Sequence, residues 1–422
     1  MNSYISDWKY NHKVSFPKYQ KMLGKFVICS KVENSFWLYD SPYFKYLNCR
    51  IETNLNNLKF DDINFYEIRK GEILNKLNSN LIKKINSGLI TLVINNLTEI
   101  DTQYNFNRYK YRMERAGINT DNVILLDGNQ NKFGDSHMRF NWVLCKFKFA
   151  NWEFYNDSYF NSDNYIKPKT FLSFNRRPSH TRLYLVYQLL KNKLNLESYI
   201  SLCGDMGEIY DHTIKEICNF MGEEISDDEI KNFLGDIPLF LDITTDGVQL
   251  DTGNLIDTTG EDTSHFSFIK DTYFWVTTET TFGCKFHYAN SIKYDDDGEY
   301  YNVIYPTEKT YKSIMSNPTI IVGDPGILGH LHQLGFKTFP DFFDERYDEI
   351  VDDKKRMNFI INDIKRIYNL PKNELHRKWS DNISNVKHNL EIMENISVDD
   401  LYLEFYTKIF NRVVEFKNKI NN

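Results

Sequence analysis

Short apolar runs alternate with helix-period segments along this chain, and this alternation constrains its fold more than any other feature. Runs at residues 26–29, 89–94 and 123–126 have the continuous apolar character of buried strands. Parallel strands covered by helices on both faces have this pattern. Polar turns are expected after the last two runs, at residues 95–96 and 127–129. The first part of the chain is therefore predicted to be α/β with a parallel sheet.

The second part repeats this alternation. A strand is expected at 170–174, followed by a helix whose apolar stripe is Leu183, Val186, Leu189 and Leu190. Ser226 and Glu229 form a capping-box pattern at the start of another helix. Residues 273–339 predict a βαβαβ order, with strands at 273–278, 319–323 and 336–339. The first of the two helices opens with Pro306 near its first position, and the second spans 327–334.

Three polar clusters follow the strands and helix starts of this βαβαβ segment. They are Thr278–Glu279, Thr307–Glu308–Lys309 and Asp324–Pro325–Gly326. Because right-handed crossovers place the carboxyl ends of parallel strands along one edge, we expect these clusters to converge. The tail carries two further predicted helices, with apolar stripes at 357–367 and 401–416. Packing back on the fold is expected rather than a coiled coil, since no heptad is sustained.

The length of 422 residues suggests more than one domain. Residues 151–168 lack clear periodicity, which marks the expected crossing between halves. We predict an N-terminal α/β domain at 1–155, a C-terminal α/β domain at 156–375, and helices at 376–422 that pack back on the fold. Composition limits the partners, because 51 Lys+Arg against 58 Asp+Glu give a net charge of -7 and no global attraction for nucleic acid or anionic membranes.

Features that the sequence lacks further limit the class of protein to which this chain can belong. No apolar run reaches about eighteen residues, so no membrane partner is expected. The six cysteines form no CxxC pair, which predicts buried thiols in a reducing, cytoplasmic compartment and no metal site. The acidic run at 295–297 is interpreted as a solvated turn in preference to a divalent-ion site, because it ends in Gly298 as a hairpin tip does.

Two groups of residues are candidates for binding an anion. Thr307, Glu308 and Lys309 open a predicted helix, where unpaired N–H groups and an ammonium favour a phosphate. Arg176 and Arg177 lie between a predicted strand and helix, and a guanidinium matches diphosphate oxygens. Residues 161–195 contain seven Lys+Arg against one acid. The alternative for each group is an ordinary solvated surface.

Glu99 and Asp101 are the candidate general bases. They follow the predicted strand at 89–94, where a carboxylate can face the crevice between the two halves. The alternative is that both are solvated loop acids. His330 and His332, two positions apart on a predicted helix, point to different faces and are not expected to share a metal.

Three segments, taken in order, resemble the GT-B glycosyltransferases related to α-1,3-fucosyltransferases, including their viral and phage relatives. The matching segments are residues 171–178 with Arg182, residues 275–280, and residues 306–310 continuing through 334–339 to 344–348. The resemblance covers roughly residues 170–370. It implies two Rossmann-like domains facing a cleft, with a nucleotide-sugar donor held mainly by the second and an acceptor by the first. It also implies inverting, metal-independent transfer without a cofactor.

The resemblance further assigns roles at matching positions. Arg177 or Arg176 would contact the donor diphosphate, Glu308 the ribose or sugar hydroxyls, and Lys309 the phosphate. Glu279, Thr307 and Asp324 complete the predicted donor site. The predicted function is a glycosyltransferase whose acceptor is a glycan, a protein or a hydroxylated DNA base, in the host cytoplasm if the gene is viral. The alternative is a non-catalytic nucleotide- or glycan-binding protein that kept the fold.

Overall fold

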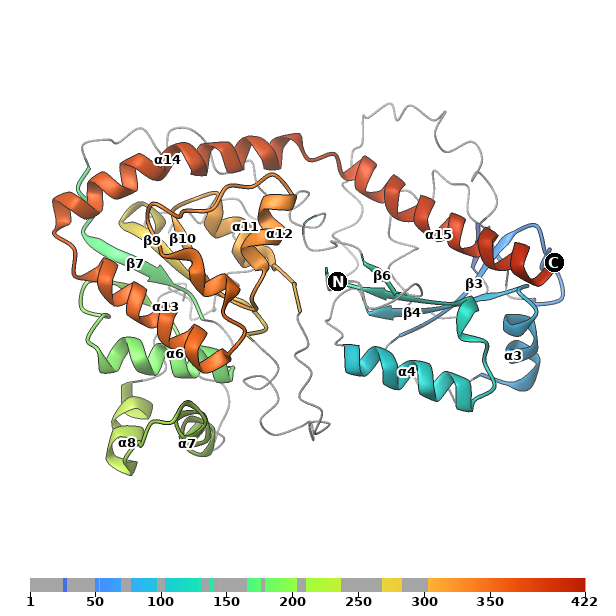
Figure 1. Cartoon of the computed structure of the whole chain (residues 1–422), viewed down its shortest axis with the longest axis horizontal. Helices are drawn as coiled ribbons and strands as arrows, with labels where there is room; N and C mark the ends of the chain where they lie inside the picture. The colour runs from blue at the N-terminus through green and yellow to red at the C-terminus, as the bar shows by residue number, and fades with distance from the viewer. Residues whose placement is uncertain are drawn as a thin grey trace, which may run out of the picture.

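The computed structural model describes most of the second half of the chain and part of the first. The described residues are 26–28, 50–52, 54–69, 77–96, 103–128, 130, 137–139, 144, 165–175, 179–202, 210–236, 268–282 and 303–421. Within them the protein is a mixed α/β fold with two separate sheets, each made of parallel strands. Figure 1 shows the two sheets at opposite ends of the long axis of the molecule.

The first sheet contains six strands in the order β2-β1-β3-β4-β5-β6. Their bounds are β1 Phe26–Ile28, β2 Arg50–Ile51, β3 Ile63–Arg69, β4 Thr91–Asn96, β5 Val123–Asp127 and β6 His137–Arg139. The helices α3 (Ser79–Asn86) and α4 (Gln103–Arg115) and the 3-10 turn η3 (Thr120–Asn122) connect them. Apolar side chains of α3, β4 and β5 form its core, among them Ile85, Leu92 and Val123.

The second sheet contains four strands in the order β10-β9-β7-β8. Their bounds are β7 Lys169–Ser173, β8 Tyr199–Ile200, β9 Thr272–Thr278 and β10 Thr319–Val322. The connecting helices are α6 (His180–Lys191), α7 (Tyr210–Met221), α8 (Asp227–Asp236), α11 (Glu308–Ile314) and α12 (Ile327–Gln333). All seven residues of β9 are buried, as expected for a central parallel strand covered on both faces. The predicted strands at 170–174, 273–278 and 319–323 are thus confirmed within one residue at their ends.

The end of the chain forms the 3-10 turn η7 (Glu345–Glu349) and the helices α13 (Asp353–Tyr368), α14 (Lys372–Asn395) and α15 (Val398–Asn421). The prediction of two tail helices was wrong, because α14 is a third. It packs on the second sheet, where the indole N–H of Trp379 donates to Asn317 Oδ1 at 3.0 Å. α15 lies instead on the first sheet, where the Lys417 ammonium donates to the carbonyls of Phe60 and Asp62. The tail therefore packs back on both parts of the fold (Figure 1).

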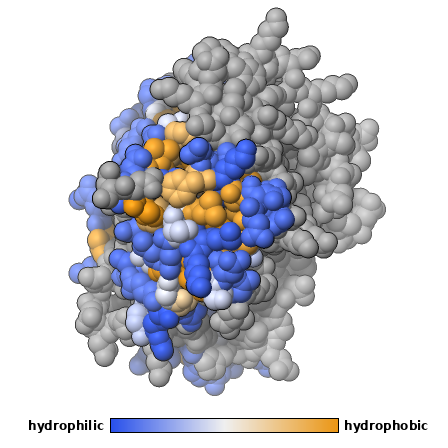
Figure 2. Space-filling model, turned by 90° about the vertical axis from the view of Figure 1, so that its right-hand side faces the viewer, coloured by the Kyte–Doolittle hydropathy of each residue, from blue (hydrophilic) through white to orange (hydrophobic). Residues whose placement is uncertain are grey.

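Figure 2 looks at the end of the molecule that carries α3 and α15, and shows apolar side chains gathered among hydrophilic ones. The backbone conformation at this end favours a glycine. At Gly88, which has φ 75°, an added Cβ would lie 2.8 Å from Ile420 Cδ1 of α15. Among the described residues, no helix combines the length and the apolar character needed to cross a membrane.

Several local predictions need correction. Asn95 and Asn96, expected in a turn, continue β4 and pair with β3 and β5. Residues 336–339 do not form a strand. Side chains bind their backbone instead, because Lys337 N donates to Asn389 Oδ1 and Phe339 N donates to Glu345 Oε1. The βαβαβ prediction therefore loses its last strand.

Two helices also differ in detail from the prediction. Pro306 lies outside α11, because Thr307 is the residue that caps this helix. In α6 nearly every residue from Thr181 to Leu189 is buried, so the apolar stripe expected along one face is only part of its buried surface. The capping box of Ser226 and Glu229 is confirmed at the start of α8, with the Ser226 N–H 2.9 Å from Glu229 Oε2.

Candidate functional site

The order of the second sheet singles out one place on its edge. In chain order its strands run 2-1-3-4, because β8 and β9 flank β7 on opposite sides. The connection from β7 therefore runs to β8 on one side, whereas the connection from β9 runs to β10 on the other side. The gap between the carboxyl ends of β7 and β9 is thus a topological switch point. Ligands of open parallel α/β sheets bind in the crevice at such a point.

A buried polar network occupies this switch point. The Thr278 hydroxyl, at the end of β9, donates to Asn175 Oδ1 at 2.7 Å. Arg182, in the first turn of α6, donates through Nε to the same hydroxyl at 3.3 Å. The Asn175 N–H donates to Ser201 Oγ at 3.1 Å, so the ends of β7 and β8 are joined as well. All four side chains are buried. The network places a guanidinium at the carboxyl edge of the sheet.

Glu279 connects this edge to the start of α11. Its Oε1 accepts hydrogen bonds from the Thr307 N–H at 2.8 Å and from the Thr310 hydroxyl. Glu279 is only 1% exposed, and among the described residues its Oε2 has no hydrogen-bond partner. Burial raises the pKa of this carboxyl, while the nearby Lys309 ammonium and the hydrogen bonds from Thr307 and Thr310 oppose the rise. The carboxylate therefore fixes where α11 begins.

Glu308 and Lys309 are the first two residues of that helix. Thr307 caps it, since its hydroxyl accepts from the Lys309 N–H at 3.3 Å. The Lys309 ammonium lies 2.5 Å from Glu308 Oε1, and the two side chains are 25% and 30% exposed. Burial raises the pKa of Glu308, but the charge and hydrogen bond of Lys309 outweigh it and leave the pKa below its usual value. The pair is ionised and reachable from solvent at this edge of the sheet.

Asp324 follows β10 by two residues and is buried. The start of the following helix, α12, is occupied by protein. Asp348 Oδ2 accepts from Leu328 N at 3.2 Å and Gly329 N at 3.4 Å, and the Gly326 N–H donates to the Asp348 carbonyl. Burial raises the pKa of Asp348, and these N–H groups oppose the rise. The N–H groups that open α12 are therefore already bonded.

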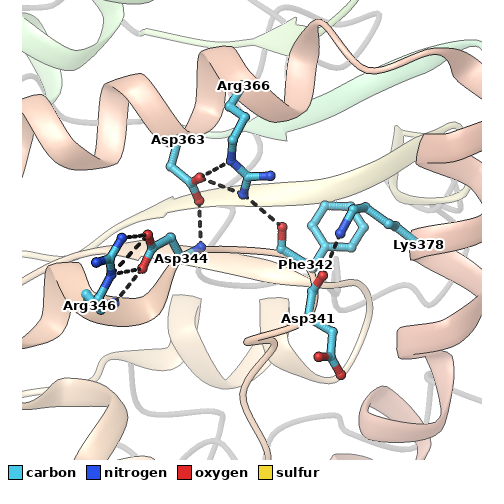
Figure 3. A network of polar contacts seen from close by, with 7 residues as sticks. All are labelled: Asp341, Phe342, Asp344, Arg346, Asp363, Arg366 and Lys378. Carbon is cyan, nitrogen blue, oxygen red and sulfur yellow. Dashed lines mark hydrogen bonds and ion pairs between the residues drawn. The ribbon is translucent and has the colours of Figure 1, made fainter.

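A groove of about 800 Å³ lies beside α12, and its basic side chains Arg346, Arg366 and Lys378 are bound by protein groups. Figure 3 shows how: Arg346 pairs with Asp344, Arg366 with Asp363, and the Lys378 ammonium donates to the Asp341 carbonyl at 2.7 Å. Asp363 Oδ2 also accepts from the Asp344 N–H at 2.9 Å. These contacts hold the loop after α12 against α13 and α14, which indicates a structural role.

The basic segment at 161–195 divides between two edges of the sheet. Arg182 lies at the carboxyl edge, as described above. Lys169 begins β7 at the amino edge, and its ammonium lies 3.3 Å from the Leu196 carbonyl and 5.4 Å from the ring centroid of Tyr199. Lys167 is buried there, with its ammonium 4.4 Å from the Trp379 ring centroid. The positive charges counted together along the sequence therefore do not form one patch.

Several predicted residues lie outside the described part of the chain. These are Glu99, Asp101, Arg176, Arg177 and the acidic run at 295–297. Their roles stay predictions. Of the candidates that the structure describes, Glu279, Thr307, Glu308 and Lys309 are brought together. Thr278 was expected among the converging polar clusters but was given no role, and Asn175 and Arg182 were noted only within a motif.

The two parts of the fold meet close to α12. The Gln130 N–H, just after β5, donates to the Ile304 carbonyl at 2.7 Å, and Arg139 of β6 donates to the Gln130 carbonyl. His330 of α12 is buried, and burial, assisted by the Arg139 charge, lowers its pKa to about 4. His330 is therefore neutral at neutral pH.

The chain matches no family model, no curated protein and no solved structure.

Proposed function

We propose that this chain is a glycosyltransferase that moves a sugar from a nucleotide-sugar donor to a hydroxyl acceptor. The supporting observation is the carboxyl edge of the second sheet, where Lys309, Glu308 and Arg182 gather at the switch point between β7 and β9. A departing nucleoside diphosphate carries growing negative charge. Cations fixed at that point stabilise the transition state more than the ground state.

Each residue of this edge has a proposed role. Lys309 neutralises the diphosphate, and Glu308, already oriented by its ion pair with Lys309, accepts hydrogen bonds from ribose or sugar hydroxyls. Glu279 is a positioning residue in this proposal, since it is buried and acts through Thr307 and Thr310. Arg176 and Arg177 follow Asn175 in the sequence and are proposed as further diphosphate ligands.

The proposal extends to the arrangement of the whole chain. The two parallel sheets are proposed to form two Rossmann-like domains facing a cleft in the GT-B manner, with the acceptor on the first. Glu99 and Asp101 are the proposed bases for an inverting, metal-independent transfer to a glycan, a protein hydroxyl or a hydroxylated DNA base.

The test begins with thermal-shift screening of the full chain against GDP-, UDP-, CMP- and TDP-sugars, because a ligand that binds the native state raises its melting temperature. The stabilising sugar nucleotide is then followed for release of its nucleotide, with and without candidate acceptors. Binding without any turnover would favour the non-catalytic alternative. No stabilisation by any of them would contradict the proposal.

Lys309→Ala is the decisive variant. We expect turnover to fall by about 100-fold or more, as when one preorganised charge-stabilising group is removed. The fold should persist, because a partly exposed ion pair contributes at most about 1 kcal/mol. Lys355→Ala, on an exposed lysine of α13, is the matched control and should keep the wild-type rate. A Lys309→Ala enzyme with the wild-type rate would refute the assignment.

A further inference from the structure

A narrow cavity opens beside Lys309 on one face of the second sheet. It is lined by Phe174, Val276, Thr278, and by Trp275, Thr277, Lys309 and Lys312. The cavity itself is about 20 Å³, room for about one water molecule, and the hollow that contains it totals about 410 Å³. We name this cavity with its hollow the β9 slot. Its deep part therefore accepts one polar atom, and its outer part is open to solvent.

The walls of the β9 slot are aromatic. Phe174 and Trp275 pack edge to face, with ring centroids 5.5 Å apart and planes at 82°. Both belong to a small apolar cluster with Leu172 and Ile269 that is separate from the main core. Aromatic walls of this kind suit a flat heterocycle, since bases stack on aromatic side chains without needing charge.

Two residues that line the β9 slot each carry a polar atom that is unsatisfied within the described part of the chain. The indole Nε1 of Trp275 and the hydroxyl of Thr277 have no hydrogen-bond partner there, although their residues are only 6% and 4% exposed. The two residues alternate along β9 and so share a face of the strand. A buried donor without a partner costs free energy, which a ligand bringing an acceptor would recover.

The residues that line the β9 slot determine which hydrogen-bonding group of a ligand fits there. An indole N–H and an ammonium only donate, and a hydroxyl can donate. Lys309 and Lys312 lie three residues apart on α11 and both border the slot. Of the described residues that line it, none is acidic. An exocyclic carbonyl oxygen fits this set, whereas an exocyclic amino group would place a donor against donors.

We propose that the β9 slot binds the nucleobase of the donor and selects bases with a carbonyl at C4 of a pyrimidine or C6 of a purine, such as uracil or hypoxanthine, over the counterparts with an amino group there. This inference rests on the proposed function, because it places the base beside the Lys309 that receives the diphosphate. It predicts which base the donor nucleotide carries, which contacts with the diphosphate alone do not determine.

Matched nucleotide pairs test the proposal by titration calorimetry on the full chain. UDP differs from CDP in its carbonyl at C4 and the proton on the adjacent N3, and inosine diphosphate differs from ADP in its carbonyl at C6 and the proton on the adjacent N1. We expect the carbonyl member of at least one pair to bind about tenfold tighter or more, because a site built to hydrogen-bond one group rejects an analogue lacking it. Equal affinities within both pairs would overturn the inference.

Variants locate the selectivity in the slot. Trp275→Phe keeps the aromatic ring and loses the N–H, and Thr277→Val removes the hydroxyl at similar volume. Each should bring the carbonyl-to-amino ratio towards one, while Thr277→Ser should retain it. An unchanged ratio in both Trp275→Phe and Thr277→Val would overturn the assignment to the slot.

The outcome also separates this inference from the proposed function. If the members of both pairs bind equally and Lys309→Ala weakens all four, the diphosphate site stands and the base selection fails. If the wild-type chain binds none of the four diphosphates and no nucleotide sugar of the thermal-shift screen stabilises it, both proposals fail together. Far-ultraviolet circular dichroism and melting temperature establish that each variant is folded.

Discussion

The two edges of the second sheet use positive charge in opposite ways. At the amino edge, the ammonium of Lys167 lies over the Trp379 ring and donates to the Lys270 carbonyl at 2.6 Å, and Lys169 lies over Tyr199. At the carboxyl edge, Lys309 pairs with Glu308, and both side chains are partly exposed. Lys309 also borders a cavity lined by Trp275 and Thr277, whose buried polar atoms have no described partner. A cation held by buried rings and carbonyls stabilises the fold, whereas a cation in a partly exposed pair beside a cavity is available to a ligand.

Lys167 gives the largest expected effect at the amino edge. Burial lowers its pKa from 10.5 to about 7, with the Asp271 carboxylate opposing. Between these two values the unfolded chain binds more protons than the folded one, so stability should rise with pH from 7 to 10.5. The upper limit is about 5 kcal/mol, from 1.36 kcal/mol per pKa unit. Contact with the Trp379 ring favours the charged form and reduces this value.

Lys167→Met removes the titrating group and keeps most of the aliphatic stem. We expect the variant to lack this part of the pH dependence when urea unfolding is measured at pH 7 and pH 10. Other groups titrate in both proteins, so the difference between them is the readout. Identical pH dependence in the two proteins would show that Lys167 is charged throughout and that its contact with Trp379 outweighs burial.

Thr278→Val tests the carboxyl edge. The substitution is close in volume but removes the hydroxyl that donates to Asn175 and accepts from Arg182 Nε. Since buried partners are left unsatisfied, unfolding free energy should fall by about 1–3 kcal/mol, measured by urea denaturation. Thr278→Ser retains the hydroxyl and should recover most of the loss. A stable Thr278→Val protein would mean that the network contributes little to this edge.

Three strands of the second sheet, β7, β9 and β10, could be predicted from sequence, because each is an apolar run ended by polar residues. β8 was not predicted, since it has only two residues. β3 was missed, since Asn64, Glu67 and Arg69 interrupt its apolar pattern. α14 was missed for a related reason. It buries polar residues such as Asn389, whose amide donates to the Ile314 and Lys337 carbonyls. A search for apolar residues at helical spacing does not find a buried face that contains asparagines.

Of the candidate site, too, only the features that are local in the sequence could be predicted. Helix-start signals located Thr307, Glu308 and Lys309, because a cap and a first-turn acid are local features. The partners of Thr278 are 96 and 103 residues away in the sequence, and only the folded sheet brings them together. The basic segment at 161–195 shows the opposite case, in which residues close in the sequence lie apart in the fold. A strand and its crossover helix place its lysines and arginines at opposite edges of the sheet.

Lys169→Ala gives the smallest expected effect and tests the comparison most directly. Lys169 belongs to the same basic segment as Arg182, but it lies at the amino edge. Its ammonium contacts the Tyr199 ring and the Leu196 carbonyl near the surface, so we expect a loss of about 1 kcal/mol or less in unfolding free energy. Nucleoside diphosphate affinity, measured by calorimetry beside Lys309→Ala, should stay at the wild-type value. If Lys169→Ala weakened diphosphate binding as much as Lys309→Ala, the two edges would not be functionally distinct. The ligand would then be recognised through the charge of the whole segment and not through the geometry of the switch point.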